Sequence, residues 1–197
     1  MTLYLASTSP RRRTLLAQTD ISFSVLDIAI DETLRANELP NSYVERLAKE
    51  KAEAGFNSVQ DPDTAVVLAA DTIVVLEDKV LGKPEDKAQA QTMLHSLSGR
   101  SHVVMTAFAI KTKDQIRVQR VNTTVFFRPI TSKEVEWYWH TGEQSDKAGG
   151  YGIQGKGGIF VSTISGSYSA VVGLPLAEVM TALHSLDIHP EQTPATS

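Results

Sequence analysis

The amino-acid sequence predicts an α/β fold in which a mixed, twisted sheet is flanked by helices. Strand-like and helix-like patterns of apolar residues alternate along the chain, with no internal repeat and no low-complexity linker. Two long β segments, residues 102–110 and 116–128, flank the polar turn KTKDQ and predict a hairpin, which a purely parallel sheet does not contain. With 197 residues, 42% of them hydrophobic, the chain can bury the core of about one domain.

The first half of the chain contains five predicted elements. Ser9 is a favourable N-cap and Pro10 a favourable first helical residue, because proline has no N–H to leave unpaired and its φ already suits a helix. Asn41 or Ser42 is the expected cap of the second helix. The elements are a strand at 3–6, a helix at 10–18, a strand near 23–28, a helix at 41–54 and a strand at 65–76.

The second half contains the hairpin, further helices and a glycine-rich region. Thr131 and Glu134 predict a capping box for a helix over 132–140. Nine of the twelve glycines lie within 142–173, so backbone there can approach a ligand closely. The other predictions are a helix from Pro84 or Glu85 to a C-terminal Gly99, closure of the 132–140 helix by Gly142, a strand at 158–164, a helix from near Pro175, one domain over 1–188 and a flexible tail over 189–197.

Composition excludes several classes of protein. The net charge of −4 gives no general basic footprint for nucleic acid or an anionic membrane. The absence of cysteine excludes a disulfide framework, a thiol nucleophile and thiolate metal sites, and fits a reducing compartment. No apolar run approaches the roughly 20 residues that span a bilayer, and no basic segment followed by an apolar one opens the chain. We therefore expect a cytoplasmic protein.

Two charged residues interrupt apolar patterns. Asp71 lies inside AVVLAADTIVVL, where a carboxylate is normally excluded unless it is paired or binds a metal. It either caps a turn at a strand end or serves as a metal ligand or general base at the floor of a cleft. Lys51 occupies the i+7 position of the apolar stripe that begins at Val44. It either extends from the stripe to water or reaches a phosphate.

Several other charged residues are ambiguous one by one but indicate a function when they are considered as a set. Arg11, Arg12 and Arg13 lie in the first turn of a helix, where the positive end of the helix dipole repels cations. Lys83 stands between a strand and a helix start, and Glu32 lies in a loop; either alone reads as a solvated residue. Arginine forks and lysine ammoniums bind phosphate oxygens, and Mg²⁺ prefers one or two carboxylates plus phosphates and water. The set therefore points to phosphoanhydride chemistry on a nucleotide.

Sequence motifs that would indicate other kinds of site are absent or lack the structural context that they require. GYGIQG satisfies G-x-G-x-x-G, but KGGIFVSTI follows it, so no helix begins there and the dinucleotide-binding interpretation fails. No P-loop is present, and the five histidines lack zinc-site spacing. The aromatic residues of EWYWH point in different directions on a helix, which favours ordinary packing over a base-stacking platform.

Seven segments in order resemble the successive motifs of the Maf nucleotide pyrophosphatase family: LASTSPRRRTLL, RLAKEKA, LAADTIVV, GKPED, LSGRSHVVMTA, DKAGGYGIQGKGG and GSYSAVVGLPL. They cover nearly the whole chain. The resemblance implies a fold similar to Maf and inosine triphosphatase proteins, with two lobes and a central cleft, usually as a homodimer. It also implies hydrolysis of nucleoside triphosphates to monophosphate and pyrophosphate with a divalent metal, Mg²⁺ or Mn²⁺.

Family roles carry over by position. The resemblance places Asp71 as proton acceptor, with Glu32, Lys51 and Lys83 as further catalytic residues and Asp71 and Glu32 as metal ligands. It places Ser7, Ser9, Arg11, Arg12, Thr72 and Gln154 at the substrate. Arg11, Thr72 and Gln154 match the residues of the branch that acts on dTTP and UTP. The branch that acts on 7-methyl-GTP has Trp, Gln and Glu at the same three positions. Arg13 falls outside the motif and is expected to be solvated.

The expected reaction is attack of water on the α-phosphorus of dTTP or UTP, and of modified pyrimidine nucleotides, in a house-cleaning role in nucleotide metabolism. Gln154 offers an amide donor and acceptor that match the edge of uracil or thymine. Two alternatives remain open: a non-catalytic nucleotide-binding regulator of cell division, and a general phosphatase of phosphorylated metabolites. Nucleic acid and membranes are not expected partners.

Overall fold

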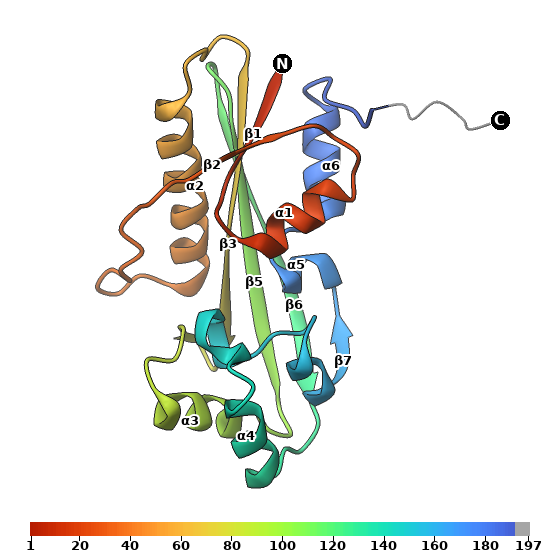
Figure 1. Cartoon of the computed structure of the whole chain (residues 1–197). Coiled ribbons are helices and arrows are strands. Elements are labelled where there is room, and N and C mark those ends of the chain that lie inside the picture. Colours follow the sequence, from red (N-terminus) through yellow and green to blue (C-terminus); the bar gives the residue numbers. More distant parts are fainter. Residues whose placement is uncertain (192–197) are drawn as a thin grey trace, which may run out of the picture.

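Seven strands form one mixed sheet flanked by helices in the computed structural model, which describes residues 1–191 (Figure 1). This confirms the predicted fold class. The strands are β1 Thr2–Ala6, β2 Ser24–Leu26, β3 Ala65–Leu76, β4 Lys79–Leu81, β5 Ser101–Lys111, β6 Ile116–Phe127 and β7 Val161–Ser165. Their order is β2-β1-β3-β5-β6-β7, with β4 paired to β3. The β2-β1 and β1-β3 pairs are parallel, and the other pairs are antiparallel.

The helices cover the sheet at two levels. They are α1 Pro10–Ala17, α2 Pro40–Ser58, α3 Lys87–Leu97, α4 Ser132–Trp139, α5 Tyr168–Val172 and α6 Leu176–His184, with short 3-10 turns at Glu143–Asp146, Ala148–Gly150 and Lys156–Phe160. Helices α1, α2 and α6 flank the upper part of the long strands, whereas α3 and α4 lie beside their lower ends (Figure 1).

Two apolar clusters share one face of the long strands. The upper cluster includes Ala70 and Phe108 and packs against α1 and α6. The lower cluster includes Val74 and Val104 and packs against α3 and α4. Because side chains on one face of a strand recur every second residue, the positions between the clusters on this face are Thr72 in β3 and Thr106 in β5, which are register partners. A polar strip therefore separates two cores built on the same strands.

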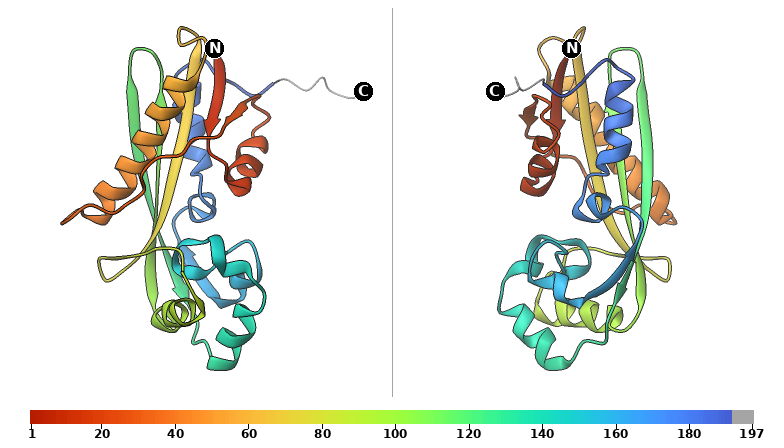
Figure 2. Two further views of the ribbon diagram at one scale, coloured as in Figure 1. Left: turned by 60° about the vertical axis from the view of Figure 1, so that its left-hand side comes forward. Right: turned by 90° about the vertical axis from the view of Figure 1, so that its right-hand side faces the viewer.

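Helix α2 covers the opposite face of the upper sheet (Figure 2). Its small residues Ala48, Ala52 and Gly55 are buried against the strands. A Cβ built on Gly55 would lie 2.9 Å from both Ala6 Cβ and Val67 Cγ1. This close approach fixes the distance between α2 and the sheet, and with it the reach of Lys51 toward β3.

Several predicted local signals are present. Thr131 and Glu134 form the complete capping box of α4. Gly99 follows the last turn of α3 with a φ of 67°, as expected for a helix C-terminus. The hairpin between β5 and β6 has Thr112 N donating to Gln115 O at 2.9 Å across its turn. These features depend only on residues adjacent in sequence.

Other predicted boundaries were wrong. Helix α2 begins at Pro40 after Leu39 and has no side-chain cap, rather than a cap at residue 41 or 42, because proline suits the first helical position. Helix α3 begins at residue 87, since the Asp86 carboxylate caps it by accepting from Gln89 N. The predicted strand at 158–164 starts at residue 161, after a 3-10 turn, and β4 and α5 were not predicted.

Ser9 occupies the N-cap position of α1, but its side chain makes no capping hydrogen bond. Near the C-terminus, Glu191 N donates to Asp20 O at 2.8 Å, so residues 189–191 of the expected tail reach the first helix–strand connection, whereas 192–197 lie outside the described residues. Within residues 1–191, no helix is both long and apolar enough to cross a membrane.

Candidate active site

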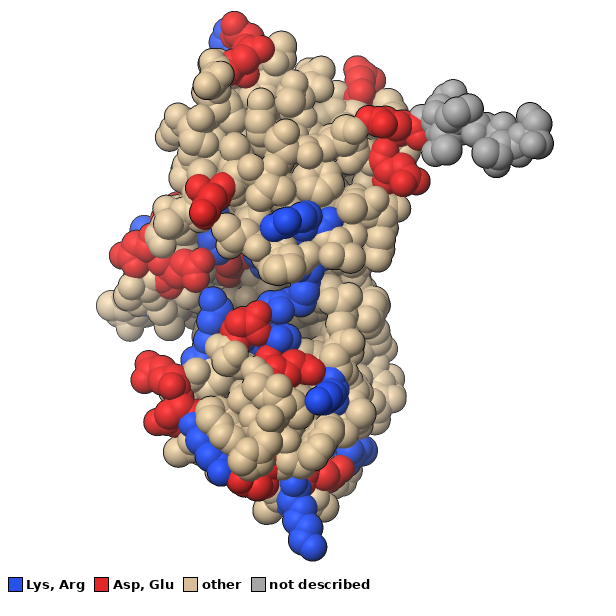
Figure 3. Space-filling view, viewed as in Figure 1, with Lys and Arg blue, Asp and Glu red and all other residues tan. Residues whose placement is uncertain are grey.

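A cavity of about 780 Å³ opens between the upper and lower clusters. Figure 3 shows a hollow across the middle of this face in which Lys and Arg side chains gather, with acidic side chains beside them. Strands β1 and β2 end at its edge, so the loops that follow their carboxyl ends reach the cavity, as is general in open α/β sheets. All ten predicted site residues line it: Ser7, Ser9, Arg11, Arg12, Glu32, Lys51, Asp71, Thr72, Lys83 and Gln154.

The consecutive residues Asp71 and Thr72 divide the cavity into two parts. Both belong to β3, and successive side chains of a strand point to opposite faces. Asp71 therefore faces α2, where Lys51 lies, whereas Thr72 faces α1, where Arg12 lies. One strand thus presents a carboxylate on one side and a hydroxyl on the other.

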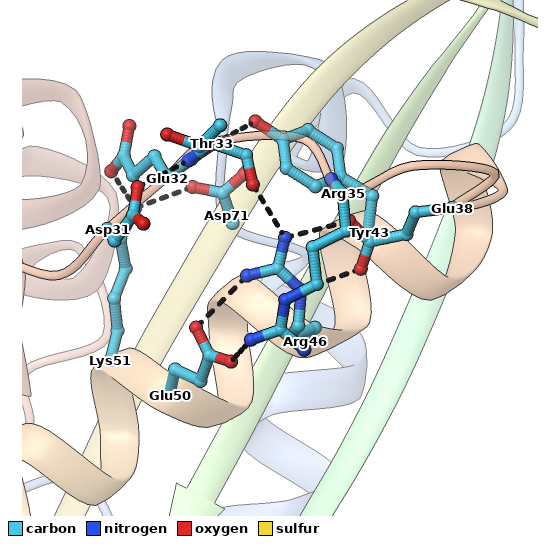
Figure 4. Close-up of polar contacts among 10 residues, drawn as sticks. All are labelled: Asp31, Glu32, Thr33, Arg35, Glu38, Tyr43, Arg46, Glu50, Lys51 and Asp71. Atoms are coloured by element: carbon cyan, nitrogen blue, oxygen red, sulfur yellow. Dashed lines mark hydrogen bonds and ion pairs between the residues drawn. The ribbon is translucent and has the colours of Figure 1, made fainter.

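Lys51 lies between two carboxylates (Figure 4). Its Nζ is 2.6 Å from Asp71 Oδ1 and 2.6 Å from Glu32 Oε1. The side chains of Asp71 and Lys51 are 10% and 12% exposed, whereas that of Glu32 is 50% exposed. Asp71 therefore does not cap a turn, and Lys51 does not extend to bulk water: each partner offsets the cost of burying the other's charge.

Glu32 is held by its loop as well as by its charge. Tyr43 Oη donates to the Glu32 carbonyl at 2.7 Å, and Arg46 Nη2 donates to the carbonyl of the following Thr33 at 3.1 Å. Burial disfavours ionisation of Glu32, but the hydrogen bond and charge of Lys51, with those of more distant cations, outweigh it and lower its pKa. Glu32 is therefore anionic at neutral pH.

Arg46, which belongs to α2, attaches this loop to the helix through hydrogen bonds. Its Nε and Nη2 donate to the two oxygens of Glu38 at 2.6 and 2.8 Å, and its Nη1 donates to Glu50 at 3.1 Å (Figure 4). Forked arginine–carboxylate pairs fix direction as well as distance. The loop that carries Glu32 has no regular secondary structure, and these bonds supply its attachment.

A chain of hydrogen bonds sets the orientation of Arg12. Its Nε donates to Gly173 O at 2.8 Å, and its Nη2 donates to Thr72 Oγ1 at 3.1 Å. Thr106 Oγ1 donates to Ala170 O at 2.6 Å, so its single proton is used there. Thr72 must then donate to Thr106 across their 3.0 Å contact, which leaves its oxygen to accept from Arg12. Each hydroxyl in this chain therefore donates its proton in one defined direction.

Arg12 retains binding capacity. With Nη1 3.4 Å from Ser7 Oγ, three of its five N–H groups have protein partners, and one remains on each terminal nitrogen. Burial lowers the pKa of Arg12, an effect that the charge of Asp71 partly offsets. A guanidinium so placed is a receptor for an anion in the cavity.

Arg11 reaches across the cavity. Its Nη1 lies 3.0 Å from Asp146 Oδ2, whose second oxygen is 2.7 Å from Lys147 Nζ. Ser7 is buried and accepts from Ser9 N at 3.2 Å, which shapes the turn before α1. Arg13 is exposed, as predicted, and does not line the cavity. The three consecutive arginines therefore have three different environments.

Lys83 and Gln154 both line the cavity, on segments that adjoin each other where Gly149 N donates to Gly82 O at 3.0 Å. Both are exposed, and neither side chain has a hydrogen bond or ion pair within residues 1–191. Lys83 follows β4, and Gln154 lies between the glycines of the GYGIQG segment. Both cavity-lining side chains are available to a ligand.

The sequence did not single out three residues that shape the site. Thr106 resembles any strand threonine until its partners are known. Glu143 and Tyr151 also line the cavity. Their proximity to the glycine-rich segment was the available signal.

Within residues 1–191, no group of three or more His, Cys, Asp or Glu side chains is arranged to hold a metal ion. Two carboxylates, those of Asp71 and Glu32, do lie close together in the cavity, where both contact Lys51 Nζ. A cation held here would take further oxygen ligands from a substrate and water, the pattern typical of Mg²⁺.

Known proteins resemble this chain over nearly its whole length. Residues 2–186 match the family described as Maf-like protein. A protein named dTTP/UTP pyrophosphatase from Pectobacterium atrosepticum is 55% identical over 89% of this chain and 88% of its own. Proteins of the same name from Aliivibrio fischeri (49% identity; 92% and 96%) and Pseudoalteromonas atlantica (50%; 94% and 97%) are similar.

Among solved structures, that of the Staphylococcus aureus Ham1 protein aligns with 64% of this chain and 72% of that chain, at 15% identity and a TM-score of 0.47. The family match across residues 2–186 and the relatives with about half of their sequence identical show to which family the chain belongs. This chain belongs to the Maf-like protein family.

Proposed function

We propose that the protein is a nucleoside triphosphate pyrophosphatase that hydrolyses dTTP and UTP to the monophosphate and pyrophosphate. The observation that carries this is the placement of the Asp71–Lys51–Glu32 cluster beside Arg12 and Lys83 in one cavity. Paired acids beside several cations match a charged polyphosphate better than a neutral ligand. The names of relatives about half identical to this chain agree with the proposal.

Asp71 is the proposed proton acceptor. Water attacks the α-phosphorus, a P–O bond to the water oxygen forms, the bond to the bridging oxygen breaks, and pyrophosphate leaves. The water proton passes to the Asp71 carboxylate. Arg12, Lys51 and Lys83 stabilise negative charge as it moves toward the leaving group, where fixed charges lower the barrier most effectively.

Asp71 and Glu32 are also the residues that would hold a divalent cation, Mg²⁺ or Mn²⁺. They fit this role because their oxygens converge on one point, now taken by the Lys51 ammonium. When bound, the cation would neutralise phosphate charge and make phosphorus more electrophilic. Two carboxylates alone hold Mg²⁺ weakly, so metal and nucleotide should bind together.

Selection of the base is assigned to Gln154, Arg11 and Thr72. The amide of Gln154 can donate to a carbonyl and accept from N3–H of uracil or thymine. A site that pairs with this edge rejects bases whose donors and acceptors are reversed, because buried groups are then left unpaired. Thr72 contributes by fixing Arg12, and Arg11 by its position in the cavity wall, where it pairs with Asp146.

Three further properties are part of the proposal. Residues 1–188 act as one bilobed domain, because both cores are built on the same long strands. A homodimer rests on the family resemblance, and light scattering of the purified protein measures it directly. A cytoplasmic location fits a cysteine-free chain and a nucleotide substrate.

The test is incubation of the protein with Mg²⁺ and a panel of nucleoside triphosphates, with pyrophosphate and phosphate assayed separately. We expect pyrophosphate from dTTP and UTP and little from purine nucleotides. Phosphate alone would indicate the general phosphatase instead. Tight nucleotide binding without any product would indicate the non-catalytic regulator, which the paired Asp71 and Lys51 argue against.

A further inference from the structure

One carboxylate ties both ends of the segment that carries Gln154. Glu143 Oε2 accepts from Lys156 N at 2.7 Å, and Glu143 Oε1 accepts from Gly157 N at 3.1 Å. The same Oε1 accepts from Tyr138 Oη at 2.8 Å, and that hydroxyl in turn accepts from Gly152 N at 3.2 Å. Residues 152 and 156–157 are thereby linked through a single side chain.

The backbone approaches this carboxylate as closely as glycine permits. A Cβ on Gly155 would lie 2.2 Å from Glu143 Oε2, and one on Gly157 would lie 2.8 Å from Tyr138 Oη. Side chains at these positions would push the segment off its anchor. The glycines are therefore needed for contact with Glu143 as well as for room beside a ligand.

The anchor is rigid and charged. Tyr138 is fully buried, and its ring packs edge-on against Phe160 with centroids 5.2 Å apart. Burial disfavours the ionised form of Glu143, but the three hydrogen bonds and the charge of Lys147 outweigh it and lower its pKa. An ionised carboxylate accepts all three donors at once, which a neutral amide does not.

Gln154 depends on this anchor, because its own side chain has no hydrogen bond within residues 1–191. The backbone on either side sets where its side chain begins, and so which part of the cavity its amide can reach. We propose that Glu143 is a positioning residue for base selection, which fixes the 152–157 segment and so presents Gln154 to the edge of a uracil or thymine base. This inference rests on the proposed function.

The main test is the isosteric substitution Glu143→Gln. It replaces one carboxylate oxygen, which accepts hydrogen bonds, with an amide NH2 group, which can only donate them. We expect the ratio of kcat/KM for dTTP to that for CTP to fall by a factor on the order of ten to a hundred, as for a misplaced contact. CTP is the comparison because cytosine reverses the donor and acceptor at N3 and at its exocyclic group. A merely structural role would lower both values by the same factor.

A double-mutant cycle connects the two residues. If Glu143 acts through Gln154, Glu143→Gln should leave the dTTP:CTP ratio unchanged in a Gln154→Ala background. Additive effects of the two substitutions on this ratio would overturn the proposal. Tyr138→Phe removes one of the three donors to Glu143 and also the acceptor of Gly152 N, so it should shift the ratio in the same direction. It is the alternative test if Glu143→Gln does not fold.

Glu136→Gln is the matched control. Glu136 also has three partners, Lys87, Gln91 and His140, and belongs to the same part of the molecule, but it does not line the cavity. It should leave the ratio at the wild-type value. A ratio shifted as strongly as in Glu143→Gln would overturn the proposal.

Binding measurements separate this inference from the proposed function. Calorimetry with dTMP and CMP reports base selection without turnover. Failure of the wild-type protein to release pyrophosphate from dTTP or UTP would overturn the proposed function alone. Equal loss of dTMP and CMP affinity in Glu143→Gln would overturn the positioning role, whereas selective loss of dTMP affinity supports it.

Discussion

Thr106→Val tests the chain of hydrogen bonds that orients Arg12. Thr106 is fully buried in β5, donates to Ala170 O at 2.6 Å and accepts from Thr72. Valine has nearly the same shape but neither donates nor accepts. The substitution therefore removes both bonds while it leaves the packing of the strand close to unchanged.

The magnitude follows from the surroundings of the two abandoned groups. Ala170 is fully buried, so its carbonyl loses its side-chain donor without access to water, at a cost of about 1–3 kcal/mol. The Thr72 hydroxyl borders the cavity and can turn to solvent, which adds little. We expect a loss of about 2 kcal/mol in the free energy of unfolding, or about 4–8 °C in Tm for a chain of this size.

The effect on substrate binding is separate. Once Thr72 turns its proton toward the cavity, Arg12 Nη2 loses a fixed acceptor, and its guanidinium is less well oriented. One hydrogen bond of about 1 kcal/mol corresponds to a rise of about fivefold in the KM for dTTP. Urea denaturation measures the first effect and steady-state pyrophosphate release the second.

Two controls make the result interpretable. Thr106→Ser keeps the hydroxyl and loses one methyl group, so it should lower stability by about 1 kcal/mol with the KM unchanged. Thr123→Val removes another fully buried hydroxyl, bonded to Ser167 and outside the cavity, and should lower stability alone. A wild-type KM for Thr106→Val, or an equal rise in Thr106→Ser, would refute the orientation of Arg12 by this chain.

Further predictions concern the acids, the base contact and pH. Asp71→Asn should abolish pyrophosphate release while calorimetry still detects nucleotide binding; retained turnover would exclude Asp71 as proton acceptor. Removal of divalent metal with a chelator should stop turnover, and Mg²⁺ or Mn²⁺ should restore it; full activity without metal would exclude the metal role. Gln154→Glu should lower kcat/KM for dTTP and UTP relative to other nucleotides, and an unchanged ratio would remove Gln154 from selection. Burial lowers the pKa of His102 from 6.5 to about 4, so the folded state stays neutral where the unfolded chain takes up a proton. Stability is then full above pH 6.5 and falls by up to about 3 kcal/mol toward pH 4; His102→Gln should flatten this part of the slope in urea denaturation, and an unaltered slope would contradict it.

The local structure was readable where neighbouring residues decide it. The capping box at Thr131 and Glu134, the left-handed Gly99 and the β5–β6 hairpin each depend on a few adjacent side chains. The N-cap of α2 was misplaced by two or three residues because proline at the first helical position competes with the polar residues that follow. Helix α5 is too short for a periodic signal, and its position depends on contacts with distant strands.

The candidate residues were readable as anomalies and as motifs. Asp71 and Lys51 break apolar patterns, and the sequence therefore marks them as costly unless they are paired or bound. What each residue contacts was not readable. The partner of Lys51 among several acids and the different surroundings of Arg11, Arg12 and Arg13 follow from how α1 and α2 pack on opposite faces of the sheet.

By itself the sequence determined the class of fold, the order of its main elements, the family resemblance and ten of the residues that line the cavity. Tertiary structure alone decided that Arg12 bonds Gly173, 161 positions away, that Arg11 bonds Asp146, 135 positions away, and that Thr106 and Glu143 orient the groups beside them. The physical reason is range. Caps, turns and periodicity depend on neighbours along the chain, whereas the direction of a buried hydrogen bond depends on which distant groups packing brings within about 3 Å.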